Sequence, residues 1–310
     1  MEAPLSCHSG SGTVSKDRSA TAVDIGIRSE VPFMKDDQVK KIVREKYGEL
    51  AGTERSCCAA GDAASCCSPR NVSKEIGYND DELNAVPQGA NLGLGCGNPV
   101  AIASLKSGET VLDLGSGAGF DCFLAANKVG KNGRVIGVDM TPEMIEKARQ
   151  NAKKGSYGNV EFRLGEIENL PAADKSIDVV ISNCVINLAP NKRRVFNEAF
   201  RVLRPGGRFM ISDLVLTKEL PSAVRESVEA YVGCVAGAIK KEEYLEAIRD
   251  AGFREIQTVN ETPYPVEVLG NDPSAKEIIE KSGLQQHEIQ GLAGSVLSIS
   301  VSGVKPRETA

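Results

Sequence analysis

The sequence predicts an α/β fold with a doubly wound, mostly parallel sheet of seven strands. Short apolar segments alternate with amphipathic helical segments after residue 108, a pattern typical of parallel βαβ units. Glycines punctuate the turns between them, most densely at positions 115, 117 and 119. With 310 residues, more than the ~100–200 typical of one domain, the chain can form this core and carry further segments.

Four segments follow from the composition and the periodicity. Residues 1–35 are rich in Ser, Gly and Thr and are expected to form a flexible N-terminal tail. Residues 36–97 hold an amphipathic helix and a cysteine-rich segment, and residues 98–216 hold the alternating core. Residues 217–310 are expected to form a C-terminal α+β module that covers the binding site like a lid.

The predicted elements can be placed in order. A helix starts at Asp36 or Asp37, Asn79 and Glu82 have capping-box spacing for a short helix over 79–86, and Asn98 caps a helix over 99–105. Seven runs are predicted strands: 110–114, 134–139, 160–164, 177–182, 208–213, 254–259 and 296–304. Further helices are predicted over 120–129, from 141, and over 191–203, 221–232 and 241–251.

The turn after the first predicted strand carries the first chemical signal. Residues 113–119 read DLGSGAG, whose glycines permit a tight turn and close approach of a ligand to the backbone. Phe120 replaces the last Gly or Ala of the dinucleotide fingerprint, and Asp113 would repel a pyrophosphate. The loop therefore favours a cationic, amino-bearing ligand, and Asp139 at the end of the second strand can accept both ribose hydroxyls.

The cysteines carry the second signal. The chain has nine, an odd number, and it shows neither a signal-peptide layout nor an apolar run of roughly 18 residues, so it is expected to be cytoplasmic and away from membranes. Thiols stay reduced there and act as ligands, nucleophiles or redox groups. The net charge of -5 argues against a nucleic-acid partner.

Three cysteines lie in connections that can converge at the binding edge of the sheet. Cys96 precedes the first strand, Cys184 follows the fourth and Cys234 follows the fifth. Thiolates are soft donors, and the remote positions of His8 and His287 disfavour a typical catalytic zinc site. Trivalent arsenic fits better, because it accepts three thiolates in a pyramid and keeps a lone pair that can attack a methyl group.

Asp113, the three glycines and Asp139 together resemble the class I S-adenosylmethionine-dependent methyltransferases, which have a Rossmann-like fold. The resemblance implies that the glycine loop approaches the methionine moiety, that Asp139 holds the ribose and that the segment at 165–167 lines the adenine. Glu166 stands where this family commonly has Asp. The implied cofactor-binding residues are Asp113, Gly115, Ser116, Gly117, Gly119, Asp139, Met140, Glu166, Ile167 and Asn183.

Six stretches narrow the resemblance to the microbial arsenite methyltransferases: LGLGCGNPVAIASLKSGETVLDLGSGAGFDC, VIGVDMTPEMIEKAR, FRLGEIENLP, ISNCVINL, RVLRPGG and YVGCVAGA. The similarity runs from about Asp36 to the end of the chain. It implies that Cys184 and Cys234 hold arsenite or methylarsenite, that Cys96 adds a third thiol, and that an upstream cysteine forms a disulfide with Cys96 during turnover.

The upstream partner lies in SCCAAGDAASCC, residues 56–67. Cys66 and Cys67 are closest to the spacing of the family, and Cys57 and Cys58 are the alternatives. For Cys57 and Cys58, an equally good interpretation is a mobile tail that gathers the metalloid and takes no part in the chemistry. A thiol reductant, glutathione or a thioredoxin-like protein, is expected as co-substrate. Cys122 is interpreted as a small hydrophobic residue.

Two polar side chains lie at strand ends, the Asn183 amide and the Asp213 carboxylate. They are interpreted either as groups that support the thiols or as groups that only form hydrogen bonds at the edge of the sheet. Two other functions stay open. One is a methyltransferase of a quinone-like or thiol substrate, and the other is a non-catalytic arsenical-binding protein.

Overall fold

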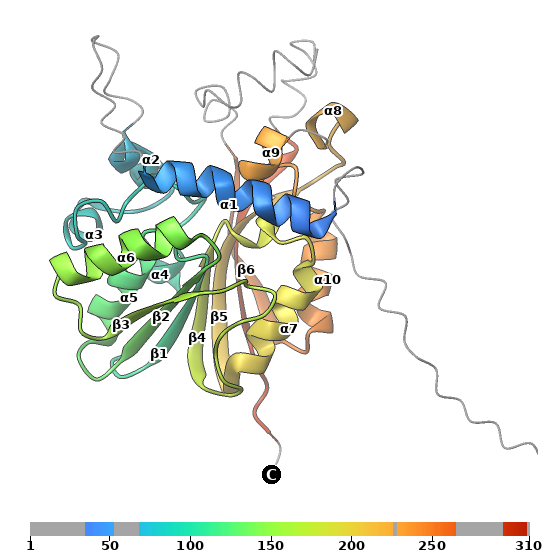
Figure 1. The fold of residues 1–310 in the computed structure, drawn as a ribbon. Coiled ribbons are helices and arrows are strands. Elements are labelled where there is room, and N and C mark those ends of the chain that lie inside the picture. The colour runs from blue at the N-terminus through green and yellow to red at the C-terminus, as the bar shows by residue number, and fades with distance from the viewer. Residues whose placement is uncertain (1–34, 53–67, 226–227, 265–293, 309–310) are drawn as a thin grey trace, which may run out of the picture.

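A seven-stranded sheet forms the centre of the computed structural model, which describes residues 35–52, 68–225, 228–264 and 294–308 (Figure 1). The strand order is β3-β2-β1-β4-β5-β7-β6. The first five strands pair in parallel, and β7 runs antiparallel to both of its neighbours, which confirms the predicted fold class. The strands are β1 Thr110–Leu114, β2 Arg134–Asp139, β3 Val160–Leu164, β4 Ile177–Asn183, β5 Leu203–Leu216, β6 Arg254–Pro263 and β7 Val296–Val304.

Helices cover both faces of the sheet because the central strands are apolar on both sides (Figure 1). Val111 and Val179 pack against the side of α4 Pro99–Ile102, α5 Phe120–Val129 and α6 Pro142–Lys154. Leu112 and Val180 point to the opposite side, where α7 Lys192–Val202 and α10 Lys241–Asp250 pack. The chain order switches between β1 and β4, the place where ligands bind in such sheets.

The N-terminal part forms three helices, α1 Asp36–Gly52, α2 Pro69–Glu75 and α3 Asp80–Asn84. The predicted capping box is present, since the Asn79 side chain accepts from the Glu82 N–H and the Glu82 carboxylate accepts from the Asn79 N–H. Helix α2 was not predicted, and its residues were interpreted as a loop. Its signal was available, because Ser68 caps the helix and Pro69 occupies its first position.

Helix α1 crosses the carboxyl edge of the sheet, above α6 in Figure 1. The Ala51 carbonyl oxygen at its end accepts a 2.9 Å hydrogen bond from Lys147 of α6. At the other side, Val39 and Val43 pack in a cluster with residues that follow β5, including Leu220 and Tyr231. The helix therefore spans from the first half of the core to the segment after β5.

Two predicted elements near the C-terminal part of the chain can be compared with the structure. Within the predicted helix over 221–232, the described residues are helical in α8 Ser222–Arg225 and α9 Val228–Val232. Strand β5 starts at Leu203, before the Pro205-Gly206-Gly207 turn that was expected to precede it, and a register shift against β4 accommodates the extra residues. Strands β6 and β7 continue the core sheet.

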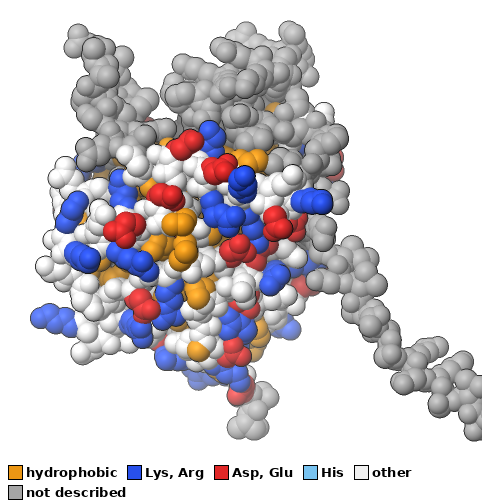
Figure 2. Space-filling model, in the orientation of Figure 1, with side chains coloured by type: hydrophobic (Ala, Val, Ile, Leu, Met, Phe, Trp, Pro, Cys, Tyr) orange, Lys and Arg blue, Asp and Glu red, His pale blue; other side chains and the backbone are white. Residues whose placement is uncertain are grey.

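Charged side chains of both signs are mixed on one face of the molecule. Figure 2 shows Lys and Arg side chains interspersed with Asp and Glu side chains on one face. Several of these charges are paired, as in the contacts of Arg208 with Glu109 at 2.7 Å and of Arg201 with Glu198 at 2.7 Å. Among the helices that the structure describes, none has both the length and the apolarity to cross a membrane.

Candidate active site

The glycine loop between β1 and α5 depends on its glycines. Gly115 has a φ of 69° and a Cβ there would lie 2.3 Å from the Val185 side chain, so no other residue fits. Gly117 has a φ of 51°, and a Cβ there would meet no protein atom within 4 Å. The space beside Gly117 is thus open to a ligand, as the sequence predicted for this loop.

Asp139 is held rigidly at the end of β2. Its carboxylate accepts hydrogen bonds from the Gly117 N–H at 2.9 Å and from the Thr141 N–H at 2.8 Å. Burial raises the pKa of Asp139, and these backbone hydrogen bonds oppose that shift. The carboxylate therefore ties the glycine loop to β2 and keeps further lone pairs for a ligand.

Asp113 lies at the end of β1 and is almost fully buried. The Cys122 thiol donates a 3.2 Å hydrogen bond to it, so Cys122 is more than the small hydrophobic residue that the sequence suggested. Burial, followed by the neighbouring Asp121, raises the pKa of Asp113 well above its usual value. Neither of these neighbours is positively charged, so a cation bound beside Asp113 would supply the positive charge that favours its ionised carboxylate.

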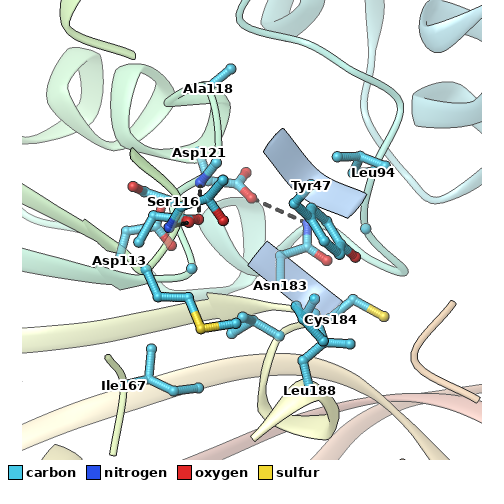
Figure 3. Close-up of a pocket in the computed structure, with 18 of the residues that line it drawn as sticks. Tyr47, Leu94, Asp113, Ser116, Ala118, Asp121, Ile167, Asn183, Cys184 and Leu188 are labelled. Atoms are coloured by element: carbon cyan, nitrogen blue, oxygen red, sulfur yellow. Dashed lines mark hydrogen bonds between the residues drawn. The ribbon is translucent and has the colours of Figure 1, made fainter. Parts of the chain in front are cut away.

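The Asn183 amide joins the Cys96 loop to helix α5. Its oxygen accepts from the Cys96 N–H at 3.0 Å, and its nitrogen donates to the Gly97 carbonyl at 2.8 Å and to the Asp121 carboxylate at 3.1 Å (Figure 3). The Tyr78 hydroxyl donates to the same carboxylate at 2.6 Å. Burial raises the pKa of Asp121 to about 6. Tyr78 and Asp121 were not identified from the sequence, because an isolated Tyr in the connection between α2 and α3 or an isolated Asp in a helix carries no motif.

One pocket collects the predicted cofactor residues. Figure 3 shows Asp113 and Ser116 on one side of it, Asn183 and Cys184 on the other, and Ile167 below Asp113 in the view. The Ser116 Oγ is buried and has no hydrogen-bond partner among the described residues, so a ligand can satisfy it. The predicted cofactor residues that line this pocket are Asp113, Gly115, Ser116, Gly117, Asp139, Met140, Glu166, Ile167 and Asn183. Gly119 instead caps α5 beside it.

Helix α1 closes one side of this pocket. Lys40 pairs with Glu166 at 2.7 Å and also with Glu168, and Tyr47 lines the pocket nearby. Burial raises the pKa of Tyr47, and the charges of Cys234, Cys184 and Asp139 raise it further. The sequence indicated only an amphipathic helix here, because the partner of Lys40 is distant in the chain.

The three predicted cysteines of the core converge. The Cys184 Sγ, the Cys96 Sγ and an Asp213 carboxylate oxygen all lie within 4.8 Å of one another. The Cys234 thiol donates a 2.8 Å hydrogen bond to the Cys184 carbonyl oxygen. All three are free thiols. Cys184 is partly exposed to the pocket, and Cys96 and Cys234 are buried behind it.

Both Cys184 and Cys234 have left-handed backbone conformations, with φ values of 57° and 65°. Such a conformation is uncommon for a residue other than glycine and persists where the surroundings fix it. The Cys184 N–H donates to the Ser212 carbonyl at 2.8 Å, and the Cys234 N–H donates to the Tyr231 carbonyl at 2.9 Å. These turns aim the two side chains toward each other.

The pKa of each of the three thiols is raised. For Cys96 the main cause is burial. For Cys184 the hydrogen bond with the Cys234 thiol lowers the pKa, but the bond with the Cys96 thiol and burial outweigh it. For Cys234 the bond with Cys184 comes first and burial second. The thiols therefore keep their protons until a ligand displaces them.

Asp213 lies beneath the thiols and is fully buried. Its carboxylate accepts from Asn187 at 2.8 Å, from the Leu214 N–H at 2.9 Å and from the Tyr244 hydroxyl at 3.1 Å. Burial raises the pKa of Asp213 to about 7, and the charge of the fully buried Lys192 opposes that shift. Burial lowers the pKa of Lys192 itself to about 8.

Several predicted residues lie outside the described part of the chain. They are Cys7, His8, Cys57, Cys58, Cys66, Cys67 and His287. The predicted disulfide between Cys96 and an upstream cysteine therefore stays a prediction.

Comparisons with known proteins agree with this geometry. A sequence model described as a methyltransferase domain matches residues 105–252. The arsenite methyltransferase of Halobacterium salinarum is 52% identical over 230 residues, which are 71% of this chain and 59% of that protein. The human arsenite methyltransferase is 34% identical over 229 residues, again 71% of this chain and 59% of that protein. The chain thus spans less than two thirds of these relatives.

A solved structure is also similar to this chain in sequence and fold. The crystal structure of an arsenic (III) S-adenosylmethionine methyltransferase from Chlamydomonas reinhardtii is 32% identical, with a TM-score of 0.55. The match covers 76% of this chain and 73% of that one. On this similarity of sequence and fold, the chain belongs to the S-adenosylmethionine-dependent arsenite methyltransferase family.

Proposed function

We propose that this protein transfers methyl groups from S-adenosylmethionine to trivalent arsenic bound by cysteine thiolates. One observation carries the proposal. Asp139 and the glycine loop line the same pocket as Cys184, the Cys184 Sγ lies within 4.8 Å of the Cys96 Sγ, and the Cys234 thiol donates to the Cys184 carbonyl oxygen. A cofactor bound at the first end would lie beside a metalloid bound at the second.

The residues of the pocket fit this cofactor. The carboxylate of Asp139 suits ribose hydroxyls, the buried Asp113 suits the methionine ammonium group, and the unpartnered Ser116 hydroxyl suits a polar atom of the ligand. Met140, Glu166 and Ile167 line the remaining wall, where an adenine would lie. When bound, S-adenosylmethionine supplies an electrophilic methyl group on its sulfonium.

The thiols would hold arsenite as substrate. Three thiolates replace the hydroxyls of arsenite, so each thiol gives up its proton and water leaves. The arsenic keeps a lone pair, and that pair forms the new bond to carbon, so no general base is required. Burial of Cys96 and Cys234 and the cover of α1 exclude water from this step.

A redox step completes the proposed cycle. Methylation raises the formal oxidation state of arsenic from three to five, because the lone pair becomes a bond. Two thiolates that close to a disulfide release two electrons, and these return arsenic to the trivalent state. Cys96 with Cys66 or Cys67 is the proposed pair, and a thiol reductant of the glutathione or thioredoxin class in the cytoplasm would reopen it.

The experiment is to incubate the full chain with methyl-labelled S-adenosylmethionine, arsenite and glutathione, and to identify labelled arsenicals by chromatography. Methylated arsenic that forms only with all components supports the proposal. Labelled product without arsenite would instead indicate a quinone-like or thiol substrate. Arsenite binding with no product would indicate a non-catalytic arsenical-binding protein.

A further inference from the structure

Two thiols and one carboxylate form a compact cluster of metal-ligating atoms. The Sγ atoms of Cys96 and Cys184 and an oxygen of Asp213 lie within 4.8 Å of one another. In a tetrahedral zinc site, with Zn–S of about 2.3 Å and Zn–O of about 2.0–2.2 Å, neighbouring ligand atoms lie roughly 3.5–3.8 Å apart. Closing the cluster onto one ion therefore requires shifts of about 1 Å at most.

The carboxylate is already oriented for such a role. One Asp213 oxygen accepts from Asn187 at 2.8 Å and from the Leu214 N–H at 2.9 Å, and the other accepts from the Tyr244 hydroxyl at 3.1 Å. Carboxylates that bind metals are usually held by hydrogen bonds of this kind. Each carboxylate oxygen has two lone pairs, so the oxygen facing Tyr244 can still donate to an ion.

The charge of the cluster also suits a divalent cation. Two thiolates and a carboxylate carry three negative charges, and a divalent ion would neutralise two of them. The fully buried Lys192 interacts with the charge of Asp213 and can balance the third. Trivalent arsenic has no use for the carboxylate, because it takes soft donors. Dependence of binding on Asp213 therefore distinguishes a divalent cation from trivalent arsenic.

We propose that Cys96, Cys184 and Asp213 form a binding site for a thiophilic divalent cation of the zinc and cadmium class. Cys234, whose thiol lies 2.8 Å from the Cys184 carbonyl oxygen, or a water molecule from the pocket fills the fourth position. The sequence argued against zinc because no histidine is near, and the buried carboxylate supplies the missing hard ligand. The proposal of a cation site depends only on this cluster of ligand atoms. The claim that arsenite binds to the same thiols rests on the proposed function.

The test uses Cd²⁺ and the full chain. The five cysteines outside the described residues also bind thiophilic ions, so they are first replaced by serine: Cys7, Cys57, Cys58, Cys66 and Cys67. Titration with Cd²⁺ is followed by the ultraviolet charge-transfer absorption of Cd²⁺–thiolate bonds. One equivalent is expected to bind to this variant.

Three further substitutions are compared in that background. Asp213→Asn is expected to weaken Cd²⁺ binding at least tenfold and to change the arsenite affinity less than twofold. Cys184→Ser is expected to remove most of the absorption. Cys122→Ser is the matched control, because Cys122 is a buried free thiol outside the cluster, and its Cd²⁺ affinity should not change. Unchanged Cd²⁺ affinity in either Asp213→Asn or Cys184→Ser overturns the site.

Two other measurements cover a failure of Asp213→Asn to fold, which circular dichroism would show. X-ray absorption of the Zn²⁺-loaded serine background should give both sulfur at about 2.3 Å and oxygen at about 2.0–2.2 Å, and a shell of sulfur alone overturns the proposal. Arsenite should also displace bound Cd²⁺. If it does not, the shared site and the proposed function are both wrong, while the cation site is judged by the variants and the absorption spectrum.

Discussion

The Cys234 thiol donates a 2.8 Å hydrogen bond to the Cys184 carbonyl oxygen, and both residues have a positive φ. Two separate turns, after β4 and after α9, thus bring their side chains together at the carboxyl edge of the sheet. Because this contact requires strain in both turns, it marks the position where chemistry is expected.

We expect Cys184→Ser and Cys234→Ser each to abolish every methylation step. Two thiolates are the minimum that orients the metalloid, and a hydroxyl is a poor ligand for arsenic. The measurement is turnover of arsenite and of methylarsenite by the pure variants. Cys7→Ser, a cysteine in the N-terminal tail predicted from sequence, serves as control and should retain turnover. Retained turnover of a methylated trivalent substrate in either core variant would contradict the assignment.

Asp139→Ala should weaken S-adenosylmethionine binding by about 10–100-fold, since removal of a charged hydrogen-bond acceptor costs about 1.5–3 kcal/mol. Calorimetric titration measures this. Asp178→Asn is the matched control, because Asp178 accepts from the Thr110 N–H at 2.8 Å at the opposite end of the sheet. An Asp139→Ala variant with unchanged cofactor affinity would show that the ribose lies elsewhere.

Lys40→Met should loosen α1 over the pocket. The Lys40 side chain is 15% exposed and pairs with Glu166 and Glu168, so its loss is expected to cost about 1 kcal/mol of local stability, roughly fivefold in opening. Hydrogen exchange of the α1 amides reports this opening, and the Michaelis constant for the cofactor should rise with it. Lys41→Met removes a neighbouring lysine that is 70% exposed and should change neither quantity. Equal exchange rates in both variants would refute a role of Lys40 in anchoring α1.

The fold could be predicted from the sequence because its signals are local. The alternation of strands and helices, the capping box at Asn79 and the final strand at 296–304 each depend on residues close in the chain, and the structure has them all. Helix α2 was missed because the cysteine-rich segment before it suggested a continuous loop.

The site was less predictable than the fold because its chemistry depends on non-local neighbours. The sequence placed Cys96, Cys184 and Cys234 at one edge through the rules for parallel sheets. It named Asp213 only as a group that could support the thiols, and it did not indicate that the Asp213 carboxylate lies within 4.8 Å of two of them or that Lys40 reaches Glu166 from a distant helix. Such pairs form across the sheet, where only the folded chain sets the distances.

The buried Asp213 predicts a pH dependence of stability. Its pKa is raised by burial to about 7, so between roughly pH 4 and 7 the folded protein holds a proton that the unfolded chain has lost. Stability should therefore fall as pH rises through this range, with a slope of up to about 1.4 kcal/mol per pH unit from this group. Chemical denaturation at a series of pH values measures the slope.

Asp213→Asn should flatten the decline between pH 6 and 7. Asp121→Asn is the comparison, because burial raises the pKa of Asp121 only to about 6. This substitution should flatten the decline of stability below pH 6 and leave the slope between pH 6 and 7 unchanged. The same slope in wild type and Asp213→Asn between pH 6 and 7 would mean that Asp213 is ionised throughout.

The double variant Cys66→Ser/Cys67→Ser should lower multiple-turnover methylation while arsenite binding stays largely intact. The three core thiols can bind the metalloid without this pair, but the arsenic then lacks the dithiol that returns it to the trivalent state. Rates with glutathione and with a thioredoxin system, together with arsenite affinity, separate the two effects. Cys57→Ser/Cys58→Ser is the matched pair from the same segment and should keep turnover if Cys66 or Cys67 is the partner of Cys96. Loss in the second pair alone would assign the redox role to Cys57 or Cys58, and unchanged rates in both would remove that role from this segment.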